Sequence, residues 1–148
     1  MEKETLLKRV APCGLVCYTC AAAKDGIIQQ HGAELLKHLD GFEPYAEMMS
    51  VYDKRLKQYP VFKEVLQMIG DAGCEGCRDG VCKFPDCGIA PCIKENGHDF
   101  CFECPEFPCK EADFEPLLKV KWLRANERMM QVGVEAYFNE MKDRSHYE

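Results

Sequence analysis

The sequence predicts a mainly α protein, with helices packed around an irregular cysteine-rich metal-binding segment and little or no β structure. Apolar residues recur at the helical spacings of three and four through most of the cysteine-free chain. No run alternates apolar and polar residues for long enough to indicate a strand. The 148 residues can bury a substantial core, so we expect residues 1–148 to form a single domain.

Cysteine content divides the chain into four stretches. Three cysteines lie in residues 13–20 and eight in residues 74–109, whereas residues 21–73 and 110–148 contain none. The two cysteine-free stretches should be helical. The second cysteine stretch is dense in Gly, Pro and Asp, which predicts loops and single turns, with a short helix near residues 90–96.

Three apolar stripes with the helical period follow one another in the middle stretch. The first comprises Ile28, Leu35, Leu36 and Leu39, the second Tyr45, Met48, Met49, Tyr52, Leu56 and Tyr59, and the third Phe62, Val65, Leu66 and Ile69. Pro44 and Pro60 suit the first turns of the second and third helices, where a missing N–H costs nothing. Gly41 and Gly70 mark helix ends. We interpret the side chains of these stripes as core.

The tail predicts two more helices. Pro116 opens the first, and Gly133 separates it from a short second one. The apolar stripe of the longer helix comprises Leu118, Trp122, Ala125 and Met129. Its basic residues should form a solvated face rather than a binding patch.

The cysteines are expected to be reduced. The N-terminal residues MEKETLLKRV contain no apolar signal-peptide core, and no stretch approaches the roughly 20 apolar residues of a membrane span. A cytoplasmic location follows as the expectation, and there thiols serve metal or redox chemistry more often than disulfides. Eleven is also an odd number, which excludes a complete intramolecular disulfide set.

The spacing of the cysteines favours a metal, and zinc in particular. Three close pairs have the C-x-x-C spacing: Cys17 with Cys20, Cys74 with Cys77, and Cys101 with Cys104. Two intervening residues let both sulfurs face one ion, and two such pairs supply the tetrahedral set that zinc prefers. We predict ten metal ligands: Cys13, Cys17, Cys20, Cys74, Cys77, Cys87, Cys92, Cys101, Cys104 and Cys109.

Which cysteines share an ion is left open by the spacing. Two closed sites would use eight sulfurs, and a closed site beside an open one with three cysteine ligands is also arithmetically allowed. We expect the N-terminal trio to be completed by a sulfur from residues 74–109. His98 is a candidate ligand but is expected to be an ordinary surface histidine, as are His31 and His38.

The cysteine motifs resemble a bacterial and archaeal family known as domain of unknown function 3795. The resemblance is carried by CGLVCYTC near the start, by C-x-G-C at Cys74–Cys77, by C-x4-C at Cys87–Cys92, and by C-x2-C-x4-C ending in Phe-Pro-Cys109. The tail around Trp122 and Gly133 is similar as well. The resemblance implies a metal-binding protein of prokaryotic type and brings no established activity. Cys82 is the cysteine that fits this pattern least.

Three functions remain in competition. The first is a non-catalytic zinc protein, whose metal is structural and whose helices offer a surface to a protein partner. The second is an iron–sulfur protein in electron transfer or sensing, which the absence of a C-x2-C-x2-C-x3-C-P run disfavours. The third is an open-site metalloenzyme or thiol redox enzyme, although no catalytic motif is present. The net charge of −6 argues against a nucleic-acid partner.

Overall fold

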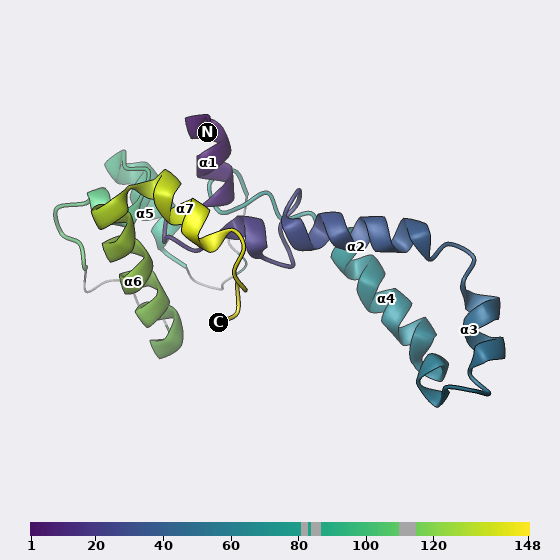
Figure 1. Ribbon diagram of the computed structural model, residues 1–148. Coiled ribbons are helices and arrows are strands. Elements are labelled where there is room, and N and C mark those ends of the chain that lie inside the picture. The colour runs from purple at the N-terminus through teal and green to yellow at the C-terminus, as the bar shows by residue number, and fades with distance from the viewer. Residues whose placement is uncertain (81–82, 84–86, 110–114) are drawn as a thin grey trace. The chain divides into compact units, whose positions relative to one another are not determined.

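Helices make up most of the regular structure, which confirms the mainly α prediction. The computed structural model (Figure 1) describes residues 1–80, 83, 87–109 and 115–148. Its helices are α1 (Lys3–Arg9), α2 (Ile27–His38), α3 (Glu43–Met49), α4 (Tyr59–Gly70), α5 (Ile89–Asn96), α6 (Pro116–Val132) and α7 (Val134–Met141). Short 3-10 turns are η1 (Cys17–Thr19), η2 (Lys54–Gln58) and η3 (Cys101–Glu103). None of the helices in these residues is long and apolar enough to cross a membrane.

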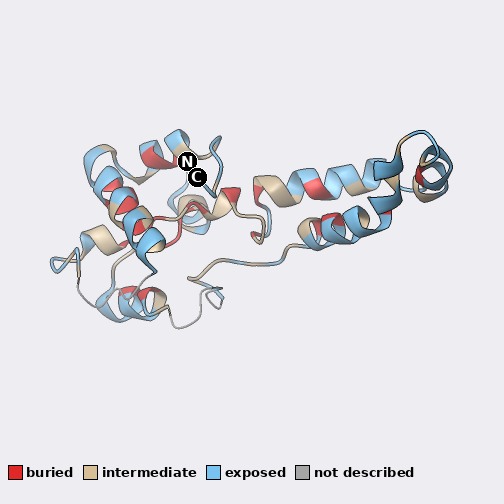
Figure 2. Cartoon of the chain, turned by 90° about the horizontal axis from the view of Figure 1, so that it is seen from below, coloured by how far each residue is buried: buried red, intermediate tan, exposed pale blue. Residues whose placement is uncertain are grey.

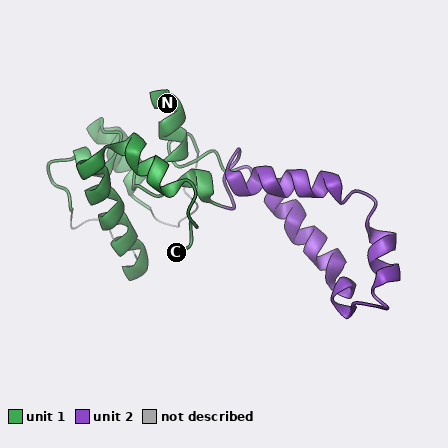
Figure 3. Ribbon diagram, in the orientation of Figure 1, with its two compact units in different colours: residues 1–20, 74–148 green, residues 21–73 purple. Residues whose placement is uncertain are grey.

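The chain divides into two compact units (Figure 3). Residues 1–20 and 74–148 form one, which we call the cysteine unit, and residues 21–73 form the other, which we call the helical unit. The boundaries coincide with the edges of the cysteine-free middle stretch. Whether the two units unfold together, as a single domain would, stays a prediction.

The helical unit is built on the pairing of α2 with α4, which run side by side (Figure 1). The two helices approach closely at Gly32 and Gly70. A Cβ on Gly70 would lie 2.6 Å from Leu36 Cδ1, and one on Gly32 would lie 2.9 Å from Ile69 Cγ2. The Gln29 side chain donates a hydrogen bond of 2.7 Å to the Gly70 carbonyl and holds the end of α4. Small residues at the crossing therefore permit this close packing.

The prediction that the apolar stripes are core was wrong for most of the second stripe, although Tyr59 is buried. Helix α3 ends at Met49, and a turn follows before Asp53 accepts a hydrogen bond from the Arg55 N–H and starts η2. The side chains of Tyr45, Met48 and Tyr52 are 59%, 60% and 90% exposed, and Figure 2 colours exposed residues pale blue. A two-turn helix that packs against the short η2 turn and α4 has too little partner surface to bury a whole stripe. In the third stripe the prediction was wrong for Phe62 and Val65, which are 45% and 49% exposed.

The cysteine unit has a conventional apolar core around α6. The predicted stripe is confirmed for Trp122, Ala125 and Met129, which are buried, while Leu118 is partly buried. The main core cluster comprises Val10, Val16, Phe100, Ala125, Met129, Tyr137 and Phe138. Helix α1, which the periodicity did not predict, packs on α7 through its leucines. An isolated antiparallel bridge joins Val10 to Val16 and turns the chain back between them.

Candidate metal centre

All ten predicted cysteine ligands lie in the cysteine unit. Cys82 lies outside the described residues. Nine of the ten fall into two groups, according mainly to which sulfurs interact electrostatically with one another. The tenth, Cys87, lines the cavity of the first group and packs beside Trp122 with members of the second. The first group joins Cys20 to Cys74, which are more than 50 residues apart in sequence, as the predicted closure of the N-terminal trio requires.

The first sulfur group comprises Cys13, Cys17, Cys20, Cys74 and Cys77. Cys17 interacts electrostatically with Cys20 and Cys74, and Cys13 with Cys17 and Cys77. All five line one cavity of about 80 Å³, together with Cys87. The N-terminal cysteine stretch and the C-x-x-C pair at residues 74–77 therefore face a common space.

Tight turns set the direction of these sulfurs. Gly14 and Gly76 have φ angles of +87° and +90°, in the left-handed region that favours glycine. The turn at Gly14 brings a backbone hydrogen bond from Leu15 to the Cys13 sulfur, which acts to lower the pKa of that thiol. In η1, the Cys20 N–H donates 2.9 Å to the Cys17 carbonyl and brings both ends of that pair to one side.

The second sulfur group comprises Cys92, Cys101, Cys104 and Cys109. Cys101 interacts electrostatically with the other three. Cys92 comes from α5, where the Asn96 side chain donates to its sulfur at 3.6 Å, and it is exposed. The η3 turn joins Cys101 to Cys104 through a 3.1 Å backbone hydrogen bond. Four sulfurs from three short segments thus meet around Cys101.

The only tryptophan of the chain lies between the groups. Trp122 is 1% exposed and packs with Ile89 and Ile93. Four cysteines pack against this cluster: Cys13, Cys87, Cys101 and Cys109. The indole N–H interacts with the Cys101 sulfur and acts to lower its pKa. Changes at either group are therefore expected to reach this ring.

Asn126 fixes the two groups relative to each other. This fully buried residue of α6 donates from Nδ2 to the Cys13 carbonyl at 2.9 Å and to the Trp122 carbonyl at 2.8 Å. Its Oδ1 accepts from the Phe102 N–H at 3.1 Å. A backbone hydrogen bond from the Cys101 N–H to the Pro12 carbonyl, also 3.1 Å, makes a second link. Both sulfur-bearing turns are therefore held on the same helix.

Burial keeps the inner thiols protonated. Loss of solvent, reinforced by neighbouring sulfurs, raises the pKa of Cys17 to about 11 and that of Cys101 to about 11. The pKa of Cys13 is raised further by the same burial. A thiol becomes a good metal ligand only as the thiolate, so a bound cation would have to displace these protons.

The described sulfurs of each group lie near one another, but they do not form a complete metal site. Among the residues that the structure describes, no three His, Cys, Asp or Glu side chains are already arranged to hold a metal ion. A cation could be held here only if the turns moved inward by small amounts. The donor chemistry, four or five thiols on each of two groups of turns, still suits zinc or iron.

His31 and His38 have the ordinary positions that the sequence predicts, and His98 is partly buried. His38 pairs with Glu34 in the helical unit, and His31 is exposed there. His146, which the sequence analysis did not single out, lines the first cavity. Its Nδ1 lies 3.0 Å from the Val16 carbonyl, an acceptor that requires a proton on Nδ1. No spacing signal links this residue of the tail to the cysteines.

Comparison with known proteins gives one result. A family model described as "Protein of unknown function (DUF3795)" matches residues 9–114, which include every cysteine of the chain. No curated protein and no solved structure matches. The tail residues around Trp122 and Gly133 lie beyond the matched stretch.

Proposed function

The chain belongs to the DUF3795 family, and from its arrangement of thiols we propose that this member is a metal-binding protein whose cysteines hold zinc in a structural role. The observation that carries the proposal is the convergence of Cys17 and Cys20 with Cys74 and Cys77 on one cavity. Nothing but the fold brings these two C-x-x-C pairs together. Paired C-x-x-C turns are the usual frame of a closed four-thiolate zinc site.

The proposal assigns two zinc ions to each chain. Four sulfurs of the first group would hold one ion, and the four of the second group would hold the other. Zinc–sulfur bonds of about 2.3 Å require sulfurs about 3.8 Å apart in a tetrahedron, so binding would draw the turns inward. Bound in this way, zinc supplies cross-links between segments and leaves no open position for substrate. Reduced thiols and metal ligation both fit a cytoplasmic protein.

Elemental analysis of freshly purified protein, with an absorption spectrum, tests this function. We expect about two zinc ions per chain and no visible colour. The paired variant Cys17→Ser/Cys20→Ser should retain one ion, as should Cys101→Ser/Cys104→Ser, whereas Cys87→Ser should retain both. A brown, iron-containing protein would indicate an iron–sulfur cluster in place of zinc. Metal-free protein with unoxidised thiols would refute metal binding altogether.

We also propose that the helical unit offers its apolar surface to a protein partner. Four residues of α4 carry this surface: Val61, Phe62, Val65 and Met68, which are 45–68% exposed. Contiguous exposed apolar side chains of this kind are typical of interaction sites. The cysteine unit would then be the scaffold and the helical unit the contact surface.

Charged substitutions on α4 test whether this apolar surface is exposed to solvent rather than covered by protein. Val65→Glu with Met68→Glu should change the free energy of unfolding by no more than about 0.5 kcal/mol, because exposed positions tolerate such changes. Leu66→Ala, at a buried neighbour, should cost about 2–5 kcal/mol. Urea unfolding measures both. A cost above 1 kcal/mol for the charged pair would mean that the same chain, or a second copy, already covers α4.

A further inference from the structure

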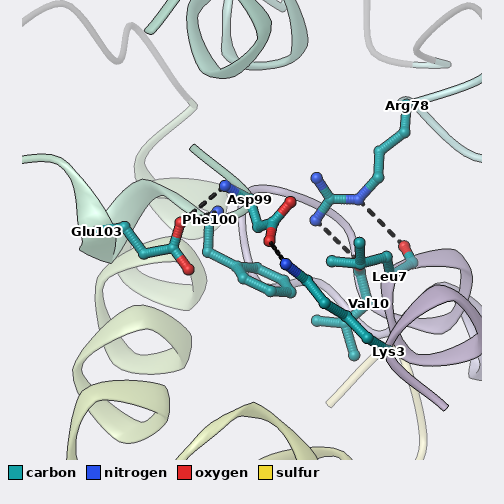
Figure 4. A network of polar contacts seen from close by, with 7 residues as sticks. All are labelled: Lys3, Leu7, Val10, Arg78, Asp99, Phe100 and Glu103. Carbon is teal, nitrogen blue, oxygen red and sulfur yellow. Dashed lines mark hydrogen bonds and ion pairs between the residues drawn. The ribbon is translucent and has the colours of Figure 1, made fainter. Parts of the chain in front are cut away.

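Arg78 directly follows Cys77 and reaches into a network that surrounds the end of α1 (Figure 4). Its Nε donates to the Leu7 carbonyl at 3.1 Å and its Nη2 to the Val10 carbonyl at 3.5 Å. Its guanidinium carbon lies 4.9 Å from the centroid of the Phe100 ring. These contacts fix a cation at the carboxyl end of α1, where backbone carbonyls are unpaired.

Arg78 lines a small cavity together with Cys17 and Cys77, two members of the first group. Asp99 acts on the guanidinium, but this carboxylate also pairs with Lys3 at 2.6 Å. Other groups that act on Arg78 are Lys3 and the sulfurs of Cys13, Cys17 and Cys77. Arg78 is half-buried, and a buried cation is costly unless an anion accompanies it.

Metal binding would supply that anion. Four thiolates around a divalent zinc ion carry a net charge of −2, whereas the same four thiols without metal carry none. The Arg78 contacts also tie the C-x-x-C pair at Cys74 and Cys77 to the backbone beside Cys13. The electrostatic surroundings and the position of Arg78 therefore both depend on the state of the first group, while the guanidinium itself stays charged.

We propose that Arg78 is the counter-cation of the first metal centre and couples metal binding to closure of the Cys74–Arg78 turn on α1. The inference rests on the proposed zinc binding. It makes Arg78 a positioning residue, because it acts through the thiolates and does not itself contact the metal. Removal of the charge should therefore weaken zinc binding, and a lysine at the same position should recover it.

The test compares Arg78→Met, which removes the charge, with Arg78→Lys, which keeps it. Zinc affinity is measured on the full chain by competition with a chromophoric chelator, and emission from buried Trp122 checks that each zinc-saturated variant is folded. Residues that support metal ligands typically change affinity by 10–100-fold, so we expect at least about tenfold weaker binding for Arg78→Met. Arg78→Lys should recover most of that loss.

The matched control is Arg55→Met, since Arg55 is an exposed arginine of the helical unit that pairs with Asp53. It should leave zinc affinity unchanged. Equal losses in Arg78→Met and Arg78→Lys would overturn the proposal and make Arg78 a simple structural clamp. Failure of the wild type to bind zinc would instead refute the proposed function, which keeps the two failures distinct.

Discussion

Removal of zinc by a chelator is expected to unfold the cysteine unit while α2 and α4 stay helical. A structural zinc in a small peptide contributes roughly 10–16 kcal/mol, which is comparable to the whole net stability of a domain. The cysteine unit depends on turns that the metal would hold. The helical unit contains no cysteine, so its pairing of α2 with α4 should survive.

Two measurements resolve the units separately. Emission from Trp122, the single tryptophan, should shift to longer wavelength as this buried ring becomes exposed. Amide hydrogen exchange followed by mass spectrometry should show lost protection in α6 and retained protection in α4. Zinc should restore both signals and magnesium should not, because magnesium prefers oxygen ligands. Unchanged tryptophan emission in demonstrably metal-free protein would contradict a structural metal.

Replacement of Asn126 by leucine is expected to cost the zinc-loaded protein about 2–5 kcal/mol in the free energy of unfolding. Leucine has a similar volume but leaves the Cys13 carbonyl and the Phe102 N–H without their buried partner. Each such loss costs about 1–3 kcal/mol. The Trp122 carbonyl adds less, because it lies inside α6 and keeps its helical hydrogen bond.

Tyr137→Phe is the matched control for this loss. The Tyr137 hydroxyl donates to the Gly14 carbonyl at 2.9 Å and is likewise buried, but it makes this single contact to the first sulfur turn. Its removal should cost about 1 kcal/mol. Urea unfolding of both variants gives the comparison. An Asn126→Leu variant as stable as Tyr137→Phe would mean that Asn126 does not hold the two sulfur turns together.

Local sequence signals predicted the helices well where a strong start or stop residue was present. Pro60 and Gly70 bracket α4, and Pro116 and Gly133 bracket α6, within a residue of the predicted positions. The prediction failed for the stripe from Tyr45 to Tyr59, which Pro44 opens but no Gly or Pro interrupts. The stripe repeats at helical spacing, yet the Asp53 turn divides it and solvent meets the rings of Tyr45 and Tyr52.

The candidate site was predictable in its parts and only broadly in its assembly: the sequence indicated that the N-terminal trio meets residues 74–109, but not which sulfurs meet. The C-x-x-C spacing identified Cys17 with Cys20 as a pair, because two intervening residues make a local turn. The grouping of Cys17 with Cys74 depends on how the chain returns after the helical unit, and spacing holds no information about that return. Arg78 and His146 were missed for the same reason, since tertiary contacts alone bring them to the sulfurs.

In the sequence, the helical unit lies between two cysteines of the first group, so a force on this unit would act on that group. The unit begins at the residue after Cys20 and ends at the residue before Cys74. A partner that pulls on α4 would load both connections, and each connection leads first to a sulfur of the first group. The zinc–thiolate bonds would then bear the tension before α6 and its core do. Force on the helical unit would thus change the affinity of the first group for its metal ion.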